Sequence, residues 1–329
     1  MNFNKSNLIE IKNFKKYILK KFILNTEELN LKEIEKNILE SQYVHPAIYS
    51  ILISDSINLK SHNHNIILNE LRKISKCKSP FFNLVVGYKK DKNVFKAFRW
   101  EKYSLKRQSI QLKNDSIKNY KLDLIRKNNE NREVVLKNAY NLIEKTWLDR
   151  ALEIKELVTH VIWFKAEKYW SSTDPSAFGA IFINPQKNWH LLNYVETLLH
   201  EAGHLQLMIK ETMSPLLLNP KERVTSPIRS DPRPMKGVLH ATYVLAQMSE
   251  GLLKVANLND ENSSIALIMA KNNLNKLENG IITLREFAEF TFSGMKLFKE
   301  IELKYNELKS ELIVNANEIS SIENLNCIA

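Results

Sequence analysis

The chain has 329 residues and is 44% hydrophobic, so it can bury the core of one large domain or of two ordinary ones. Its two cysteines, Cys77 and Cys327, are far apart and lack the spacing of a metal site. A disulfide framework is therefore not expected, which fits a reducing compartment. The sequence contains neither a secretory signal nor a run of about eighteen uncharged apolar residues, so we expect a cytoplasmic protein without a membrane span.

The net charge of +11 is compatible with nucleic acid, an anionic surface or an acidic peptide as a partner. The sequence is also rich in Lys, Asn and Ile together, a bias typical of AT-rich genomes. It contains no Arg-rich run, no helix-turn-helix signature and no paired-aromatic RNA motif. We therefore expect no nucleic-acid partner, while an acidic peptide remains open.

The N-terminal part reads as helical and mixed. Apolar residues recur at helical spacing through much of residues 1 to about 75, and residues 81–88 form a strand-like apolar run. Residues 94–100 and 109–112 are candidates for further short strands. The polar stretch 113–133 reads as a solvated connection. The sequence thus predicts an N-terminal region over residues 1–130 and a second domain over 131–329.

The second domain opens with a helix and two strands. Residues 134–156 return to helical spacing, and the apolar runs 157–164 and 177–183 have the length and the β-branched or aromatic content of strands. Residues 171–175, Ser-Ser-Thr-Asp-Pro, read as a turn between these strands. The fold class predicted is α+β and mostly helical, with a small sheet that precedes the helix described next.

The most informative segment is a helix over residues 188–210 that contains His200-Glu201-Ala202-Gly203-His204, an H-E-x-x-H motif. Residues four apart lie on one face of a helix, so both imidazoles can reach a single metal ion, with Glu201 beside it. Gly203 costs about 1 kcal/mol against Ala inside a helix, which indicates a close approach of another element. The competing interpretation is a buried helix whose two histidines have only packing roles.

A proline-rich loop over residues 214–234 follows, with Arg223, Arg229 and Arg233. Its prolines predict an ordered, non-repetitive segment, in which Arg229 and Arg233 flank Asp231-Pro232. Asp231 is a candidate cap for the next helix, over residues 234–256, which carries His240 on its first turns. Two further amphipathic helices are expected over residues 260–279 and 283–313.

A catalytic zinc site needs a third protein ligand beyond the two histidines of the motif. The metzincin pattern fails, because Lys210 and Glu211 occupy the region where its third histidine would stand. Glu222 and Glu250 lack the sequence context of a gluzincin ligand. His240, at the start of a helix after a constrained loop, is the best candidate, and a core or capping role is the alternative for it.

Three histidines without a carboxylate, close to two arginines, suggest the chemistry of non-haem iron oxygenases. In such sites 2-oxoglutarate and O2 occupy the open positions of Fe(II), and an arginine suits the distal carboxylate of 2-oxoglutarate because its fork binds in a bidentate manner. Arg233 and Arg229 are the candidates for that contact. Solvated surface arginines are the alternative.

At these residues the chain resembles the H-E-x-x-H-type, 2-oxoglutarate-dependent peptide β-hydroxylases, which are associated with the modification of ribosomally made peptides. The resemblance covers roughly residues 150–300 and rests on three segments: Ala-Phe-Gly-Ala-Ile-Phe-Ile-Asn at 177–184, Leu-Leu-His-Glu-Ala-Gly-His-Leu-Gln-Leu at 198–207, and Ser-Pro-Ile-Arg-Ser-Asp-Pro-Arg-Pro-Met-Lys-Gly-Val-Leu-His at 226–240. Ile228 departs from the aromatic residue that the family has before the first arginine.

The resemblance implies that His200, His204 and His240 bind Fe(II) and that Arg233 or Arg229 holds 2-oxoglutarate. The substrate would be a precursor peptide, hydroxylated on a side-chain β-carbon, and residues 1–130 are a candidate for recognition of a leader segment. Two alternatives stay open. One is a zinc metallopeptidase with Glu201 as general base on the metal-bound water, and the other is a non-catalytic peptide-binding module. In an oxygenase, Glu201 would instead orient a ligand or the substrate.

Overall fold

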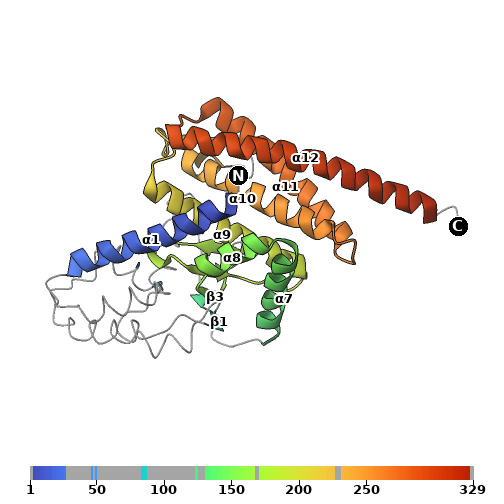
Figure 1. Ribbon diagram of the computed structural model, residues 1–329, viewed down its shortest axis with the longest axis horizontal. Helices are drawn as coiled ribbons and strands as arrows, with labels where there is room; N and C mark the ends of the chain where they lie inside the picture. Colours follow the sequence, from blue (N-terminus) through green and yellow to red (C-terminus); the bar gives the residue numbers. More distant parts are fainter. Residues whose placement is uncertain are drawn as a thin grey trace. The chain divides into compact units, whose positions relative to one another are not determined.

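The computed structural model describes residues 3–26, 46, 49, 83–86, 123–124, 130–166, 170–226 and 231–326. Over these residues the fold is α+β and mostly helical, with a small sheet that precedes the H-E-x-x-H helix, so the predicted class is confirmed. The chain divides into two compact units, residues 1–137 with 152–189, and residues 138–151 with 190–329. Figure 1 labels helices and strands along the chain. The functional boundary predicted near residue 130 stays a prediction.

In the first unit, helix α1 (Phe3–Thr26) is anchored by two polar contacts to the second half of helix α8 (Leu148–Leu157). The buried Asn7 Nδ2 donates to Glu153 Oε1 at 2.9 Å, and Lys15 Nζ forms an ion pair of 2.8 Å with Glu156 Oε2. The ring of Phe14 packs on Phe178 at a centroid distance of 4.8 Å. An apolar contact and two polar ones thus fix this helix within its unit.

The sheet of the first unit is built around strand β3 (His160–Lys165) and strand β5 (Ala180–Ile183), which pair in parallel. Strand β1 (Asn83–Val86) pairs in parallel with the other side of β3, and β2 (Asp123–Leu124) pairs with β3 in antiparallel fashion. All four residues of β5 are buried, as the continuous apolar run predicts. The predicted strands at 157–164 and 177–183 correspond to β3 and β5, which begin three residues later than predicted, and the described part of 81–88 is strand β1. The candidates at 94–100 and 109–112 lie outside the described residues.

The turn predicted at residues 171–175 is wrong for its first half. Ser171–Thr173 form strand β4, which pairs antiparallel with β5. Only then does the chain turn, where Asp174 accepts a hydrogen bond of 2.6 Å from the backbone of Ser176 and caps the 3-10 helix η2 (Pro175–Ala177). Serine and threonine have turn propensity locally, but the ladder with β5 satisfies their backbone groups here.

The second unit consists of helix α9 (Leu191–Met213), α10 (Met235–Ala256), α11 (Ser263–Phe287) and α12 (Phe292–Asn326), preceded by residues 138–151. Helix α10 packs against the other three, which explains why it is apolar on most sides. Residues 134–156, predicted as one helix, are two: α7 (Glu130–Thr146) and α8 meet at Trp147. Between α9 and α10, strands β6 (Arg223–Val224) and β7 (Arg233–Pro234) form a small antiparallel ladder.

The break between the last two helices lies at residues 288–291, not at 280–282 as predicted. Gly280 is in the middle of α11, where a Cβ atom would collide with the hydroxyl of Thr242 on α10. The glycine therefore permits close helix packing instead of ending a helix. The chain turns only where Phe290 forms a β-bridge with Leu217.

Two contacts hold α9 close to α10. At Gly203 a Cβ atom would lie only 3.0 Å from Val244 Cγ1, which confirms that this glycine marks a close approach. Next to it, the buried Arg150 donates to Gln206 Oε1 at 2.9 Å, and Tyr243 Oη donates to the same oxygen at 2.7 Å. A buried charge is stable only when it is paired or hydrogen-bonded, so this arrangement links residue 150, α9 and α10 firmly.

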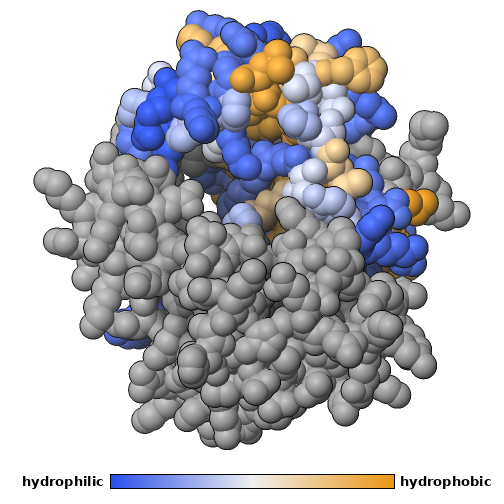
Figure 2. All heavy atoms as spheres, turned by 90° about the vertical axis from the view of Figure 1, so that its left-hand side faces the viewer, coloured by the Kyte–Doolittle hydropathy of each residue, from blue (hydrophilic) through white to orange (hydrophobic). Residues whose placement is uncertain are grey.

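Large apolar side chains on the surface are interspersed with polar ones. Phe292 and Leu218 are 91% and 68% exposed, and Figure 2 shows apolar residues among hydrophilic ones over the described part of one face. Isolated exposed apolar residues are ordinary on protein surfaces. Within the described ranges, none of the helices combines the length and the apolar character that crossing a membrane requires.

Candidate metal centre

Helix α9 presents the two histidines of the motif on one side because they are four residues apart. His190 caps its first turn, where Nδ1 accepts from the backbone of Leu192 and Asn193 Oδ1 accepts from the backbone of His190. Leu198, Leu199, Ala202 and Leu205 have no exposed surface. The helix runs from 191 to 213, three residues later at each end than the predicted range of 188–210, and His190 serves the cap.

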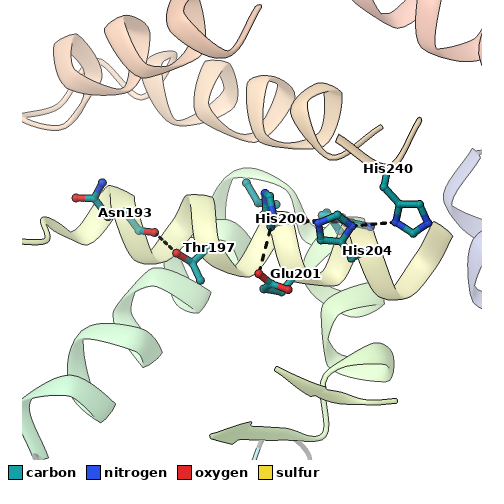
Figure 3. Close-up of polar contacts among 8 residues, drawn as sticks. Asn193, Thr197, His200, Glu201, His204 and His240 are labelled. Atoms are coloured by element: carbon teal, nitrogen blue, oxygen red, sulfur yellow. Dashed lines mark hydrogen bonds and ion pairs between the residues drawn. The ribbon is translucent and has the colours of Figure 1, made fainter. Parts of the chain in front are cut away.

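The three predicted histidines lie together. His200 Nε2 and His204 Nε2 are 3.0 Å apart, with the rings edge to face at a centroid distance of 4.6 Å. His240, from the second turn of α10, places Nδ1 at 3.1 Å from Nδ1 of His204, with the rings stacked at 5.3 Å (Figure 3). His240 thus belongs to the cluster and not to the apolar core.

A fourth residue, Glu211, completes the cluster, and the sequence interpretation missed it. Glu211 Oε2 lies 3.0 Å from Nε2 of His240 and 2.8 Å from Nζ of Lys236. Residues 200, 204 and 211 are spaced by four and seven, which is the periodicity of one helix face. That spacing was the available signal, but Glu211 was considered only as the residue standing in place of a metzincin histidine.

The hydrogen bonds of the cluster define a single proton order when all three imidazoles are neutral. An ionised carboxylate only accepts hydrogen bonds, so Nε2 of His240 donates to Glu211 and Nδ1 of His240 is left as an acceptor. Nδ1 of His204 must then donate to His240, and Nε2 of His204 accepts from His200. In this order Nδ1 of His240 and Nε2 of His204 accept hydrogen bonds and Nε2 of His200 carries a proton, so a cation bound between His200 and His204 would have to displace that proton.

The electrostatics favour an uncharged His204. Loss of hydration, together with the neighbouring His200 and His240, holds the pKa of His204 well below its ordinary value. Burial acts to raise the pKa of Glu211, but the hydrogen bonds and charges of His240 and Lys236 outweigh it and hold that pKa below its ordinary value. The centre therefore combines a neutral imidazole in its middle with an ionised carboxylate at one end.

The donor set fits a metal ion in part of its geometry. Two nitrogens bound at about 2.1 Å and at right angles to each other lie about 3.0 Å apart, which is the separation of Nε2 in His200 and His204. His240 meets His204 on the opposite edge of its ring, so the three donors do not converge on one point. Among the described residues, no group of three or more His, Cys, Asp or Glu is placed to hold a metal. Ligation by all three histidines requires one ring, at His204 or His240, to turn.

Glu201 is more enclosed than its neighbours in the motif. Its side chain has no exposed surface, whereas that of His200 is 34% exposed. Glu201 Oε1 lies 3.9 Å from Nε2 of His200, the contact drawn in Figure 3. A carboxylate in this position can influence His200 directly, whereas action on a water molecule from solvent would require access that this packing does not provide.

Arg233, one of the two candidates for binding 2-oxoglutarate, is in strand β7, seven residues before His240. Its Nε forms an ion pair of 3.1 Å with Asp231 Oδ2, and its side chain is 15% exposed. The predicted capping role of Asp231 is wrong, because the cap of α10 is Pro234 and no side chain bonds the first turn. The second candidate, Arg229, lies outside the described residues.

The chain was compared with models of known protein families and with curated proteins, and neither comparison finds a match.

The low pKa of His204 predicts a pH-dependent stability for the metal-free protein. Below about pH 6.5 the unfolded chain binds a proton at this residue and the native protein does not. The free energy of unfolding therefore decreases as the pH is lowered, by up to about 1.4 kcal/mol per pH unit. We expect His204→Gln to reduce this slope between about pH 7 and pH 5, measured by urea denaturation with a chelator present. An identical slope in the variant and the wild type would contradict it.

Proposed function

We propose that the chain is an Fe(II)- and 2-oxoglutarate-dependent oxygenase that hydroxylates a side-chain β-carbon of a ribosomally made peptide, with His200, His204 and His240 as the metal-binding residues. The observation that carries the proposal is the contact between His204 and His240. These residues are 36 positions apart and on different helices, yet their Nδ1 atoms lie 3.1 Å apart. Packing alone does not call for three imidazoles in mutual contact.

Bound Fe(II) and 2-oxoglutarate would supply oxidation by O2, in which one oxygen atom enters a substrate C–H bond and the other enters succinate as CO2 is released. The chain itself provides the donors and the entrance. His204 stays neutral, as a ligand must, because its pKa is held low. His200 is more exposed than His240, with 34% of its side chain accessible against 10%, so a substrate would approach from its side.

The candidate anchor for 2-oxoglutarate is Arg233. The ion pair with Asp231 holds its guanidinium in one orientation, and a guanidinium retains several donors after one contact with a carboxylate. The small ladder of β6 and β7 ties this arginine to the start of α10, which carries His240. Arg229 remains a second candidate on the basis of its place in the sequence.

A peptide substrate is proposed from the resemblance in three sequence segments and from the charge of the chain. A net charge of +11 favours encounter with an acidic peptide. Residues 1–130 are proposed to recognise a leader segment of that peptide, and a cytoplasmic location is proposed because ribosomal precursors are made there. The test is to load the protein with Fe(II) and 2-oxoglutarate without oxygen, add candidate peptides encoded nearby, and admit O2. Absence of both succinate and an oxygen-bearing product would count heavily against the function.

His240→Ala is expected to weaken Fe(II) or Co(II) binding by more than about tenfold, because a ligand is lost. Metal affinity is measured by competition with a chromophoric chelator, and His190→Ala is the matched control, since His190 caps α9 outside the cluster. Unchanged affinity in His240→Ala would return this histidine to a packing role. A wild-type protein that binds no metal tightly would favour the peptide-binding module.

Arg233→Ala is expected to raise the KM for 2-oxoglutarate at least tenfold and to leave metal affinity unchanged, because a charge-assisted bidentate contact is lost. Arg223→Ala is the control for local structure, since Arg223 Nη2 donates to Pro232 O at 2.9 Å in the same ladder. Equal effects of the two substitutions would show that the ladder matters and the charge of Arg233 does not.

Glu201→Gln separates the oxygenase from the zinc peptidase. A peptidase that uses Glu201 as general base should lose hydrolysis almost completely, whereas an oxygenase should retain 2-oxoglutarate turnover, because no base is needed to remove a hydrogen atom. The enclosure of Glu201 supports the second outcome. Succinate formation and peptide cleavage, measured on the same variant, decide between them.

A further inference from the structure

We propose that the outer face of helix α12 binds the same face of a second copy of this chain, with the two helices antiparallel. The outer face is defined by five exposed side chains: Phe292, Lys299, Leu303, Glu307 and Val314. The proposal does not depend on the proposed function, because it concerns a part of the second unit other than the histidine cluster.

The outer face lies opposite the side of α12 that belongs to the core. The core side packs on α10 and α11 (Figure 1) and buries Leu297, Ile301, Tyr305 and Leu308. At about 100° per residue, Leu303 points about 160° away from both Ile301 and Tyr305. A second molecule could therefore approach the outer face without displacing any contact of the core.

The apolar residues of the outer face are aligned. Phe292, Leu303 and Val314 are 91%, 64% and 54% exposed, and they are spaced by eleven residues, which is close to three helical turns. They thus lie in one line along about 33 Å of helix. A single exposed apolar side chain is ordinary, but three in line on one helix face are typical of a surface that binds a partner.

The charges of the outer face identify that partner as a second copy. Lys299 and Glu307 stand four residues before and four residues after Leu303. If two copies of α12 pair antiparallel about a twofold axis at Leu303, each Lys299 meets Glu307 of the other copy. A parallel pair would instead place Lys299 against Lys299 and Glu307 against Glu307. The charge pattern therefore favours the antiparallel pair and disfavours the parallel one.

The remaining positions fit the same axis. Phe292 and Val314 are each eleven residues from Leu303, so the phenylalanine of one copy meets the valine of the other. Lys296 comes opposite Ser310, so no like charges are brought together there. The carboxylate of Glu307 contacts Lys304 of its own helix at 3.1 Å, yet 67% of the Glu307 side chain is exposed, so it can accept a second donor.

A contact along one pair of helices is at the small end of specific protein interfaces, so we expect a dissociation constant in the micromolar range. The net charge of +11 on each copy opposes association, and salt screens this repulsion. The full chain is therefore studied by sedimentation velocity at about 0.15 M salt, over roughly 1–300 µM protein. We expect a monomer–dimer equilibrium.

Leu303→Asp is expected to raise the dissociation constant of the dimer at least about tenfold, because two apolar side chains at the axis are replaced by two like charges. The matched control is Ile268→Asp on α11, since Ile268 is 61% exposed and lies on another helix. We expect the control to leave the dissociation constant unchanged. Because Leu303 is exposed, thermal unfolding of its variant is expected to match that of the wild type.

A charge exchange tests the antiparallel arrangement. Lys299→Glu and Glu307→Lys are each expected to raise the dissociation constant about fivefold, because two ion pairs become two like-charge contacts. The double variant is expected to return to within about twofold of the wild type, since the pairs form again with reversed signs. Lys299→Glu also lowers the net charge of +11 by two units, which by itself would favour association. Lys271→Glu, an exposed position of α11, makes the same change of charge and serves as the control.

Three results would overturn the proposal. A wild type that stays monomeric over the whole concentration range would leave the outer face to a different partner or to solvent. A dimer that Leu303→Asp does not weaken would place the contact on another surface. A double variant as weak as its two single variants would exclude the antiparallel pairing of Lys299 with Glu307.

Discussion

The close approach of α9 and α10 is the constraint on which the candidate centre depends. Spacing alone puts His200 and His204 on one side of α9, but His240 can join them only where the two helices nearly touch. Gly203 allows that distance by offering no side chain to Val244. The hydrogen bonds of Arg150 and Tyr243 to Gln206 then hold the two helices at that separation. The close packing at Gly203 and the hydrogen bonds to Gln206 together keep α9 and α10 close to each other.

The cluster is organised for uncharged nitrogen donors. A protonated imidazole in the middle would face two others without an anion beside it, and the low pKa of His204 reflects this cost. Glu211, the carboxylate that contacts His240, lies at one end of the cluster and is itself balanced by Lys236. Such an arrangement has little use as a structural ion pair, since the central histidine carries no charge. An uncharged imidazole in this position is the form that binds a metal cation.

Sequence patterns predicted the elements in which the local conformational preference of the residues agrees with their tertiary contacts. The H-E-x-x-H helix, the apolar strands of the small sheet and the helix of His240 were all recognisable from periodicity. The errors arose where distant partners decide the outcome. Ser171–Thr173 became a strand because β5 offers a ladder, and Gly280 stayed helical because Thr242 packs against it. Glu211 was missed because a carboxylate was sought as a metal ligand, whereas this one contacts a histidine.

The route of the polypeptide through the two units has a consequence for any attempt to isolate the histidine cluster. The chain passes from one unit to the other after residues 137, 151 and 189, so the second unit is assembled from two separate stretches. Its shorter stretch, 138–151, contains Arg150, whose guanidinium donates to Gln206. A fragment that begins at residue 190 would retain all three histidines of the cluster but would lack Arg150 and its hydrogen bond to Gln206. Cutting the chain between residues 189 and 190 would thus remove the hydrogen bond of Arg150 to Gln206 from the unit that the fragment is meant to represent.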